Sequence, residues 1–357
     1  MEYAFFISPH GFGHASRCLA VMEAMLDHDP TARFHLFTTV PRPFFELSLG
    51  TRMVYHRMAC DVGFVQQDPF RIDFDATEKA LSDLLPFRER TVDSLARRIK
   101  HTALVICDIA PLGIAVGRRA GVASVLLESF TWDWMYAFYG ERQPGLLRWQ
   151  HILGETYGAA DFHVQTEPLC AEQPKADLHV GPIARLPHHQ PSQIRNSIGI
   201  DGEEKAVLIS MGGTGNTLSP QQFMDFSLEK EVVFVLPVAA KSPYRRNNVV
   251  FLPQHGPLHH VDVVYAVDAL VCKAGYSTLA EAYGAGVPVG VFIRDDFPES
   301  SALESFVIRR LSGKCFRQHS LTDFSWVREL PSLLDQPKRP RQANGASEVA
   351  RFLLAVA

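Results

Sequence analysis

Three glycine-containing turns carry the residues whose types and spacing could do chemistry. The first, Ser8 to His14, follows the apolar run Tyr3 to Ile7. Gly11 and Gly13 lack Cβ atoms, so backbone N–H groups can approach a ligand there, and a helix that begins at this point favours an anion. His14, at the mouth of the turn, can take a proton from a hydroxyl as general base. The alternative is a helix-capping histidine.

His10 lies four residues before His14, which raises the alternative of a metal pair. The two histidines stand on a turn rather than on one helix face, and the sequence shows no third ligand, so we expect no metal here. His10 is instead a candidate for contact with a sugar or acceptor. A dinucleotide cofactor is disfavoured, because the segment Gly11 to Ser16 ends in serine and the strand Phe34 to Val40 ends without an acidic residue.

The second turn follows the strand Val207 to Ser210. Gly213, Thr214 and Gly215 repeat the pattern of a phosphate-binding loop, with the Thr214 hydroxyl as a hydrogen-bond donor. The alternative is a glycine-rich surface loop.

The third turn follows the strand Ala269 to Cys272 and is the most informative. Gly275 is expected to let the chain turn tightly. Ser277 and Thr278 would then lie at a helix N-terminus, where they can bind phosphate oxygens. Glu281 lies one turn inside, where a carboxylate can accept both hydroxyls of a ribose. A capping box between Thr278 and Glu281 explains the same residues equally well.

Acidic and aromatic residues follow other predicted strands. Asp108 ends one of them, where a buried acid could orient His14 or bind substrate; an N-cap role is the alternative. Glu128 and Asp133 also follow a strand end and are interpreted as functional. Trp132 could stack on a sugar or acceptor, but it shares a helical face with two tyrosines and suits a hydrophobic core equally well.

Alternating strands and helices must position these residues. Short apolar runs alternate with amphipathic segments in both halves, which predicts an α/β fold with parallel sheets. The segment Gly181 to His189, rich in proline and histidine, interrupts the pattern and is interpreted as a linker. We expect an N-terminal Rossmann-like domain over residues 1–183 and a C-terminal one over 184–340. A helix within 341–357 is expected to pack back on the first domain.

Composition excludes several classes of protein. The 357 residues carry a net charge of −4, with no long basic run, so we expect no nucleic-acid partner. Six scattered cysteines without a CxxC pair indicate reduced thiols. No secretory signal and no run of about 20 apolar residues is visible, so a cytoplasmic location is expected and any membrane contact would be peripheral.

The segment Asp268 to Pro288 resembles the donor site of MurG-like glycosyltransferases (family 28), and the resemblance follows the chain from end to end. It implies the GT-B fold, two Rossmann-like domains with a cleft between them. By this resemblance Glu281 binds the nucleotide ribose, Ser277, Thr278 and Thr214 lie near the diphosphate, and Arg185 contacts phosphate. His255 would face the base, and Glu299 stands near the position of the family's glutamine pair.

A closer resemblance is to the glycosyltransferase-like N-terminal domain of L-arabinokinases, through the segments 11–17, 108–113 and 130–136. The first turn also resembles the UDP-sugar hydrolase of pseudaminic acid synthesis.

The sequence therefore predicts a metal-independent glycosyltransferase of the hexosyl or N-acetylhexosaminyl class that needs no cofactor. Its substrates would be a nucleotide-sugar, with UDP the preferred carrier, and a small-molecule, glycan or lipid-linked acceptor. His14, or a carboxylate such as Asp108 or Asp133, would act as general base. The alternatives are a UDP-sugar hydrolase and a nucleotide-sugar-binding module without turnover.

Overall fold

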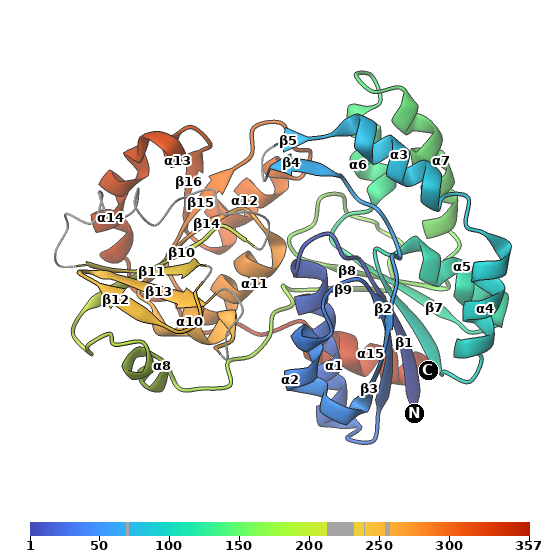
Figure 1. Ribbon diagram of the computed structural model, residues 1–357, viewed down its shortest axis with the longest axis horizontal. Helices are drawn as coiled ribbons and strands as arrows, with labels where there is room; N and C mark the ends of the chain where they lie inside the picture. The colour runs from blue at the N-terminus through green and yellow to red at the C-terminus, as the bar shows by residue number, and fades with distance from the viewer. Residues whose placement is uncertain (69–70, 213–231, 239, 254–257) are drawn as a thin grey trace. The chain divides into compact units, whose positions relative to one another are not determined.

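The computed structural model describes residues 1–68, 71–212, 232–238, 240–253 and 258–357. The chain divides into two compact units (Figure 1). Unit 1 comprises residues 1–184 and 344–357, and unit 2 comprises residues 185–343. Each unit is built around its own twisted, mainly parallel sheet.

The sheet of unit 1 has strand order β3-β2-β1-β6-β7-β8-β9, with every pair parallel. Its strands are rich in buried apolar residues, as expected for a sheet covered on both faces. The strands are β1 Glu2–Ile7, β2 Arg33–Thr38, β3 Met53–Arg57, β6 Leu104–Asp108, β7 Ser124–Glu128, β8 Phe162–Thr166 and β9 Leu178–Val180. A separate antiparallel pair is formed by β4 Gln66–Asp68 and β5 Arg71–Ile72.

Helices cover both faces of this sheet (Figure 1). Alternate residues of β1, including Tyr3 and Phe5, pack with α1 and α15 in one core, whereas Phe6 faces Gly113 of α5 on the other side. The helical segments of unit 1 are α1 Gly13–His28, α2 Pro43–Leu49, η1 Gly50–Arg52, α3 Phe74–Leu84, α4 Glu89–Ile99, α5 Pro111–Ala120, α6 Trp132–Tyr139, α7 Gly145–Tyr157 and α15 Ala346–Val356. The final helix of the chain is thus part of the first unit, where it packs on α1.

The sheet of unit 2 has strand order β12-β13-β11-β10-β14-β15-β16, parallel apart from β12. Its strands are β10 Lys205–Ser210, β11 Val232–Val238, β12 Tyr244–Arg246, β13 Val249–Pro253, β14 Ala269–Lys273, β15 Val289–Ile293 and β16 Lys314–Arg317. Its helical segments are α8 Pro191–Ser197, α10 His260–Ala266, α11 Tyr276–Ala285, α12 Ser300–Arg310, α13 Ser320–Asp323, η2 Ser325–Glu329 and α14 Leu330–Leu334. The predicted α/β class is therefore confirmed in both units.

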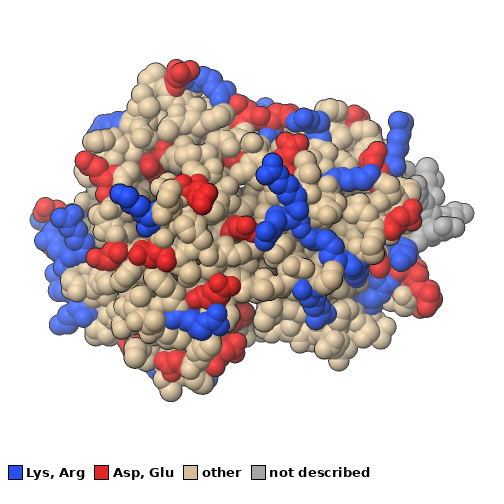
Figure 2. Space-filling view, turned by 180° about the vertical axis from the view of Figure 1, so that it is seen from behind, with Lys and Arg blue, Asp and Glu red and all other residues tan. Residues whose placement is uncertain are grey.

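The surface carries charges of both signs. On the face seen in Figure 2, basic and acidic side chains are both spread across the surface. Among the residues described, no helix is long and apolar enough to cross a membrane.

Candidate functional site

The first glycine turn joins β1 to α1 at the carboxyl edge of the unit 1 sheet. Gly11 has φ +79°, a left-handed conformation that glycine adopts without strain. Helix α1 begins at Gly13, and its N-cap residue, Phe12, makes no side-chain capping bond. The first amides of a helix have no partner within the helix. The turn therefore presents backbone N–H donors beside His14, as the sequence predicts.

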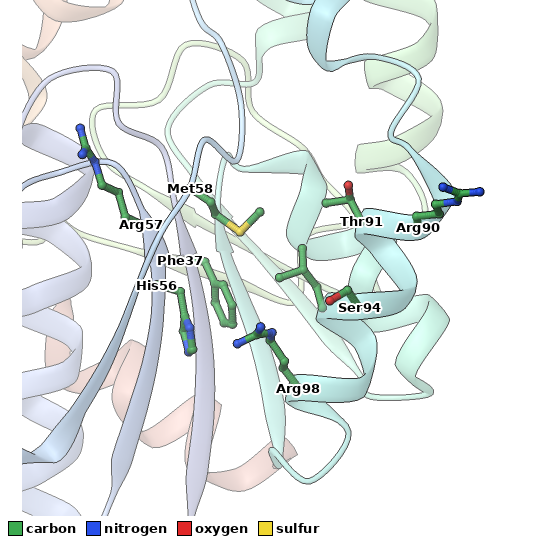
Figure 3. A pocket seen from close by; sticks show the side chains of 9 residues that line it. Phe37, His56, Arg57, Met58, Arg90, Thr91, Ser94 and Arg98 are labelled. Atoms are coloured by element: carbon green, nitrogen blue, oxygen red, sulfur yellow. The ribbon is translucent and has the colours of Figure 1, made fainter.

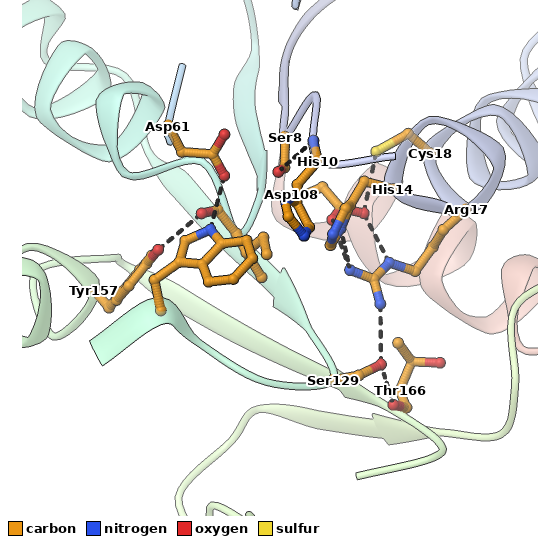
Figure 4. Close-up of polar contacts among 12 residues, drawn as sticks. Ser8, His10, His14, Arg17, Cys18, Asp61, Asp108, Ser129, Tyr157 and Thr166 are labelled. Atoms are coloured by element: carbon orange, nitrogen blue, oxygen red, sulfur yellow. Dashed lines mark hydrogen bonds and ion pairs between the residues drawn. The ribbon is translucent and has the colours of Figure 1, made fainter. Parts of the chain in front are cut away.

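His14 and Asp108 are in direct contact. Nδ1 of His14 lies 2.7 Å from Oδ1 of Asp108, across 94 residues of sequence (Figure 4). Arg17, one turn further along α1, donates from Nε to Oδ2 at 2.7 Å and from Nη2 to Oδ1 at 2.6 Å. Arg17 also donates to the hydroxyl of Ser129, which follows β7. This forked contact is the strong geometry for an arginine and a carboxylate.

The charge state of Asp108 fixes the roles of the imidazole nitrogens. Asp108 is fully buried, which by itself raises its pKa, but Arg17 and His14 outweigh burial and hold the pKa at about 2. The carboxylate is then only an acceptor, so Nδ1 of His14 must carry the hydrogen that it receives. Nε2 of His14 has no hydrogen-bond partner within the described ranges. That nitrogen is available to accept a proton.

Backbone strain occurs directly after Asp108. Ile109 has φ +42°, which is unfavourable for a β-branched residue. Its carbonyl accepts a hydrogen bond from the Tyr157 hydroxyl at 2.8 Å, and its side chain is buried. Strained backbone of this kind persists where the surroundings hold it and is frequent at functional sites.

A second acid, Asp61, belongs to the same cluster and is not evident from the sequence. Its Oδ2 accepts from Nε1 of Trp132 at 2.8 Å, and its Oδ1 is buried without a partner in the part of the chain described. Burial raises the pKa of Asp61 to about 6, although the side chains of Ser8 and Trp132 oppose the shift by hydrogen bonding. Gly63 packs so closely that a Cβ there would lie 2.8 Å from the Trp132 ring and 2.9 Å from His10.

The remaining predicted residues of unit 1 lie in three different settings. Trp132 is only 2% exposed and contacts His10 edge to face at 5.1 Å, so it is a core residue rather than an open stacking surface. Glu128 is buried and accepts from His163 and Gln165 of β8. Asp133 faces Gly154 of α7, and burial raises its pKa.

Unit 2 contains a similar cluster around Glu281. One carboxylate oxygen, Oε2, lies 2.6 Å from Nδ1 of His260, and the other accepts from Nη2 of Arg185 at 3.4 Å. Nε2 of His260 lies 2.8 Å from the hydroxyl of Ser210, at the end of β10. Burial raises the pKa of Glu281, but His260 and Arg185 more than reverse this effect and lower it.

The third turn differs from expectation in two respects. Helix α11 begins at Tyr276 with Gly275 as its N-cap, so Thr278 lies inside the first turn and the capping-box explanation for Thr278 and Glu281 is wrong. Gly275 has φ −161°, an extended conformation open to any residue, so a tight left-handed turn is not what requires glycine there. Ser277 and Thr278 do lie at the helix N-terminus.

Two further cations lie at strand ends of unit 2. Burial, together with the nearby Arg294, lowers the pKa of Lys273 to about 8. Arg294 forms an ion pair with the buried Glu299 and lies over the Phe297 ring at 3.5 Å. Glu299, predicted as a donor contact, is therefore paired with an arginine. The predicted residues Gly213, Thr214, Gly215 and His255 lie outside the described residues.

Several members of these clusters are missed by reasoning from the sequence. Arg17 could have been found, because a residue three positions after His14 shares its helical face. Lys273 and Arg294 each follow or end a strand, which is a weak signal. Asp61 and His260 belong to no motif in the sequence.

The sequence also contains two Asp-x-Asp triplets, at residues 27–29 and 73–75. Asp29 is the C-cap of α1, and Asp73 caps the N-terminus of α3 by accepting from the amide of Ala76. Both triplets therefore have structural roles at helix ends.

No family model matches the chain. The chain is 25% identical over 308 residues to the L-arabinokinase of Arabidopsis thaliana, which covers 83% of the chain and 28% of that relative's length. It is similar in structure to the calicheamicin glycosyltransferase CalG4, with a TM-score of 0.65 and 17% identity over 99% of this chain and 98% of that one. A UDP-glucosyltransferase from Polygonum tinctorium has the same TM-score and coverage, with 13% identity.

These comparisons establish the fold. Two parallel-sheet units and full-length similarity to glycosyltransferase structures confirm the predicted GT-B class. The predicted similarity to L-arabinokinases is also found, over about a quarter of the plant enzyme.

Proposed function

We propose that this chain is a glycosyltransferase that moves a sugar from a nucleotide-diphosphate donor to an acceptor hydroxyl. The observation that carries the proposal is the pair His14 and Asp108. Asp108 holds Nδ1 of the imidazole and leaves Nε2 without a partner among the described residues. A carboxylate that orients an imidazole in this way sets it up as general base.

In the proposed reaction, Nε2 of His14 takes the proton of the acceptor hydroxyl. The acceptor oxygen forms a bond to the anomeric carbon while the bond from that carbon to the diphosphate breaks, and its electron pair leaves with the diphosphate. Asp108 stabilises the imidazolium that results, because it stays ionised with a pKa of about 2. The unpartnered Oδ1 of Asp61 is a second group suited to bind an acceptor hydroxyl.

The donor nucleotide is assigned to unit 2. A carboxylate accepts up to about four hydrogen bonds, so Glu281 retains capacity for ribose hydroxyls after binding His260 and Arg185. Because Glu281 is 2% exposed, we expect a ribose to replace the longer of the two contacts, which frees Arg185 for phosphate. The N-terminus of α11 with Ser277 and Thr278, and the cation Lys273, would stabilise the departing diphosphate without a metal.

UDP is the proposed carrier, and the transferred sugar is proposed to be a hexose or an N-acetylhexosamine. The resemblance of the third turn to the MurG donor site and the similarity to a UDP-glucosyltransferase both support UDP. No disulfide joins the six cysteines, all of which lie within the described residues, and this supports a reducing compartment such as the cytoplasm.

A UDP-sugar hydrolase is the second candidate. The side chain of His14 is only 10% exposed, which favours a small nucleophile such as water over a bulky acceptor. The same base would then activate water, and the donor site would be unchanged.

Release of UDP from a panel of UDP-sugars, measured with and without candidate acceptors, separates the two. Transfer predicts UDP release that rises with acceptor and a glycosylated product detected by mass spectrometry. UDP release that acceptors leave unchanged would favour the hydrolase. Binding of UDP-sugars with no release under any condition would leave a module without turnover.

A further inference from the structure

Three side chains with metal-binding atoms meet at the amino-terminal edge of the unit 1 sheet, away from the carboxyl edge that carries His14. Glu2 begins β1, His35 lies on the neighbouring strand β2, and His101 lies three residues before the start of β6, the strand on the other side of β1. The amide of Ala103 donates to the carbonyl of Glu2, which holds the His101 segment beside β1. The strand order thus brings together residues that lie 33 and 99 positions from Glu2.

The contacts within this cluster are short. Oε2 of Glu2 lies 2.9 Å from Nε2 of His101 and 3.1 Å from Nε2 of His35. The three ligand atoms all lie within 4.8 Å of one another, and this is the one such group in the part of the chain that the structure describes. The two imidazole rings are nearly perpendicular, at 77°.

We propose that Glu2, His35 and His101 form a binding site for Zn²⁺, with water as the fourth ligand. Two imidazoles and one carboxylate are a common protein ligand set for this ion. Around a tetrahedral zinc with bonds of about 2.0 to 2.1 Å, ligand atoms are roughly 3.3 to 3.4 Å apart. The separations of 2.9 and 3.1 Å need to open by only a few tenths of an ångström.

A second histidine contact supports the orientation of His35. Metal-binding histidines usually donate their other ring N–H to an acceptor. Nδ1 of His35 lies 3.5 Å from Nε2 of His56 on β3. The His56 ring is itself fixed by stacking on Phe37, with centroids 4.4 Å apart. His56 and Phe37 form part of the wall of a pocket of about 490 Å³ beside α4 (Figure 3).

The site connects three segments of the sheet that are distant in sequence, so bound zinc would stabilise unit 1. It includes none of the residues assigned to transfer. The proposal is therefore independent of the proposed function, and it concerns stability rather than a step of the reaction.

Calorimetric titration of the untagged, chelator-treated full chain with ZnCl₂ tests the proposal. We expect saturable binding of one equivalent, a higher melting temperature, and visible absorption bands of tetrahedral Co²⁺ when cobalt replaces zinc. His101→Ala is the main variant, because His101 is half exposed and its loss leaves the core intact. It should weaken Zn²⁺ binding at least ~10-fold and abolish the cobalt bands, and His35→Gln should do the same.

His151→Ala is the matched control, since His151 is an exposed histidine paired with Glu155 at 3.5 Å in the same unit. It should bind zinc like the unchanged chain. Circular dichroism establishes that each variant is folded. The proposal is overturned if the unchanged chain binds no Zn²⁺ saturably, or if folded His101→Ala and His35→Gln bind it as tightly as the control. The cluster would then be a carboxylate hydrogen-bonded to two imidazoles and nothing more.

Discussion

Each of the two units places a buried carboxylate between a histidine and an arginine, but the contacts that the histidine and the arginine make differ between the two clusters. In unit 1, Asp108 binds Nδ1 of His14 at 2.7 Å and Arg17 through two short bonds. In unit 2, Glu281 binds Nδ1 of His260 at 2.6 Å, and Arg185 contacts it once, at 3.4 Å.

The most important difference concerns Nε2, the imidazole nitrogen that does not face the carboxylate. Nε2 of His260 is engaged by Ser210 at 2.8 Å, whereas Nε2 of His14 has no partner in the described part of the chain. The same combination of a carboxylate, a histidine and an arginine therefore provides a candidate base in one unit, whereas in the other the imidazole is hydrogen-bonded through both nitrogens. We assign proton transfer to the first cluster and nucleotide binding to the second.

The largest expected effect is on turnover. His14→Ala removes the proposed base and should lower kcat for sugar transfer by about 10²- to 10⁴-fold, with UDP affinity unchanged. His260→Ala should instead weaken UDP binding. Initial rates of UDP release and calorimetry with UDP give the two quantities. An equal loss of kcat in both variants would remove the functional distinction between the clusters.

Asp108→Asn should reduce stability strongly, because it leaves the buried Arg17 without its counter-charge. Breaking a buried pair from one side costs about 3 to 5 kcal/mol. Urea unfolding measures the change. Glu46→Gln is the control, since its pair with Arg42 is equally short at 2.6 Å but exposed, and we expect a change below about 1 kcal/mol. Similar losses in the two variants would mean that Arg17 does not depend on Asp108.

Glu281→Gln keeps the size of the side chain and removes its charge. Hydrogen bonds to charged groups contribute about 1.5 to 3 kcal/mol, which predicts UDP binding weaker by roughly 10- to 100-fold. Glu329→Gln, at a partly exposed pair with Lys314 in the same unit, should bind UDP normally. A folded Glu281→Gln protein with unchanged UDP affinity would show that the carboxylate only holds His260 and Arg185.

Ser210→Ala should release Nε2 of His260 and make the second cluster resemble the first. The loss of one hydrogen bond predicts a decrease of about 1 kcal/mol in the free energy of unfolding. If the variant also gained acceptor-independent UDP release, the free nitrogen alone would suffice for base chemistry.

The smallest effect concerns pH. Burial raises the pKa of Asp61 from 3.8 to about 6, so its contribution to stability is fully present below pH 3.8 and is lost as pH rises through 6. Asp108 has the opposite sign, because its contribution is present above pH 3.8 and is lost as pH falls through about 2. Asp61→Asn should therefore flatten the decline in unfolding free energy between pH 4 and 7, measured by urea unfolding. An unchanged slope would contradict the raised pKa.

The sequence predicts the fold well because both sheets are parallel and buried, and such strands appear as short apolar runs between amphipathic segments. It predicts His14 and Asp108 as candidates, since each stands beside a strand end, and it offers orientation of His14 as one role of Asp108 without deciding between that role and substrate binding or an N-cap. That contact depends on β1 and β6 being neighbours. Strand order also creates the cluster of Glu2, His35 and His101, which no local spacing indicates. The capping box fails because Thr278 lies inside its helix.

The position of α15 has a consequence for how the protein is made. Val349, Ala350 and Leu353 of this helix belong to the same core as α1, the helix that carries His14 and Arg17. During synthesis, residues 346–356 emerge only after the whole of unit 2. The part of α1 that packs on α15 therefore stays uncovered while the second unit is translated, whereas domains otherwise tend to fold in order from the N-terminus. Completion of the first unit therefore has to wait until the second unit has been synthesised.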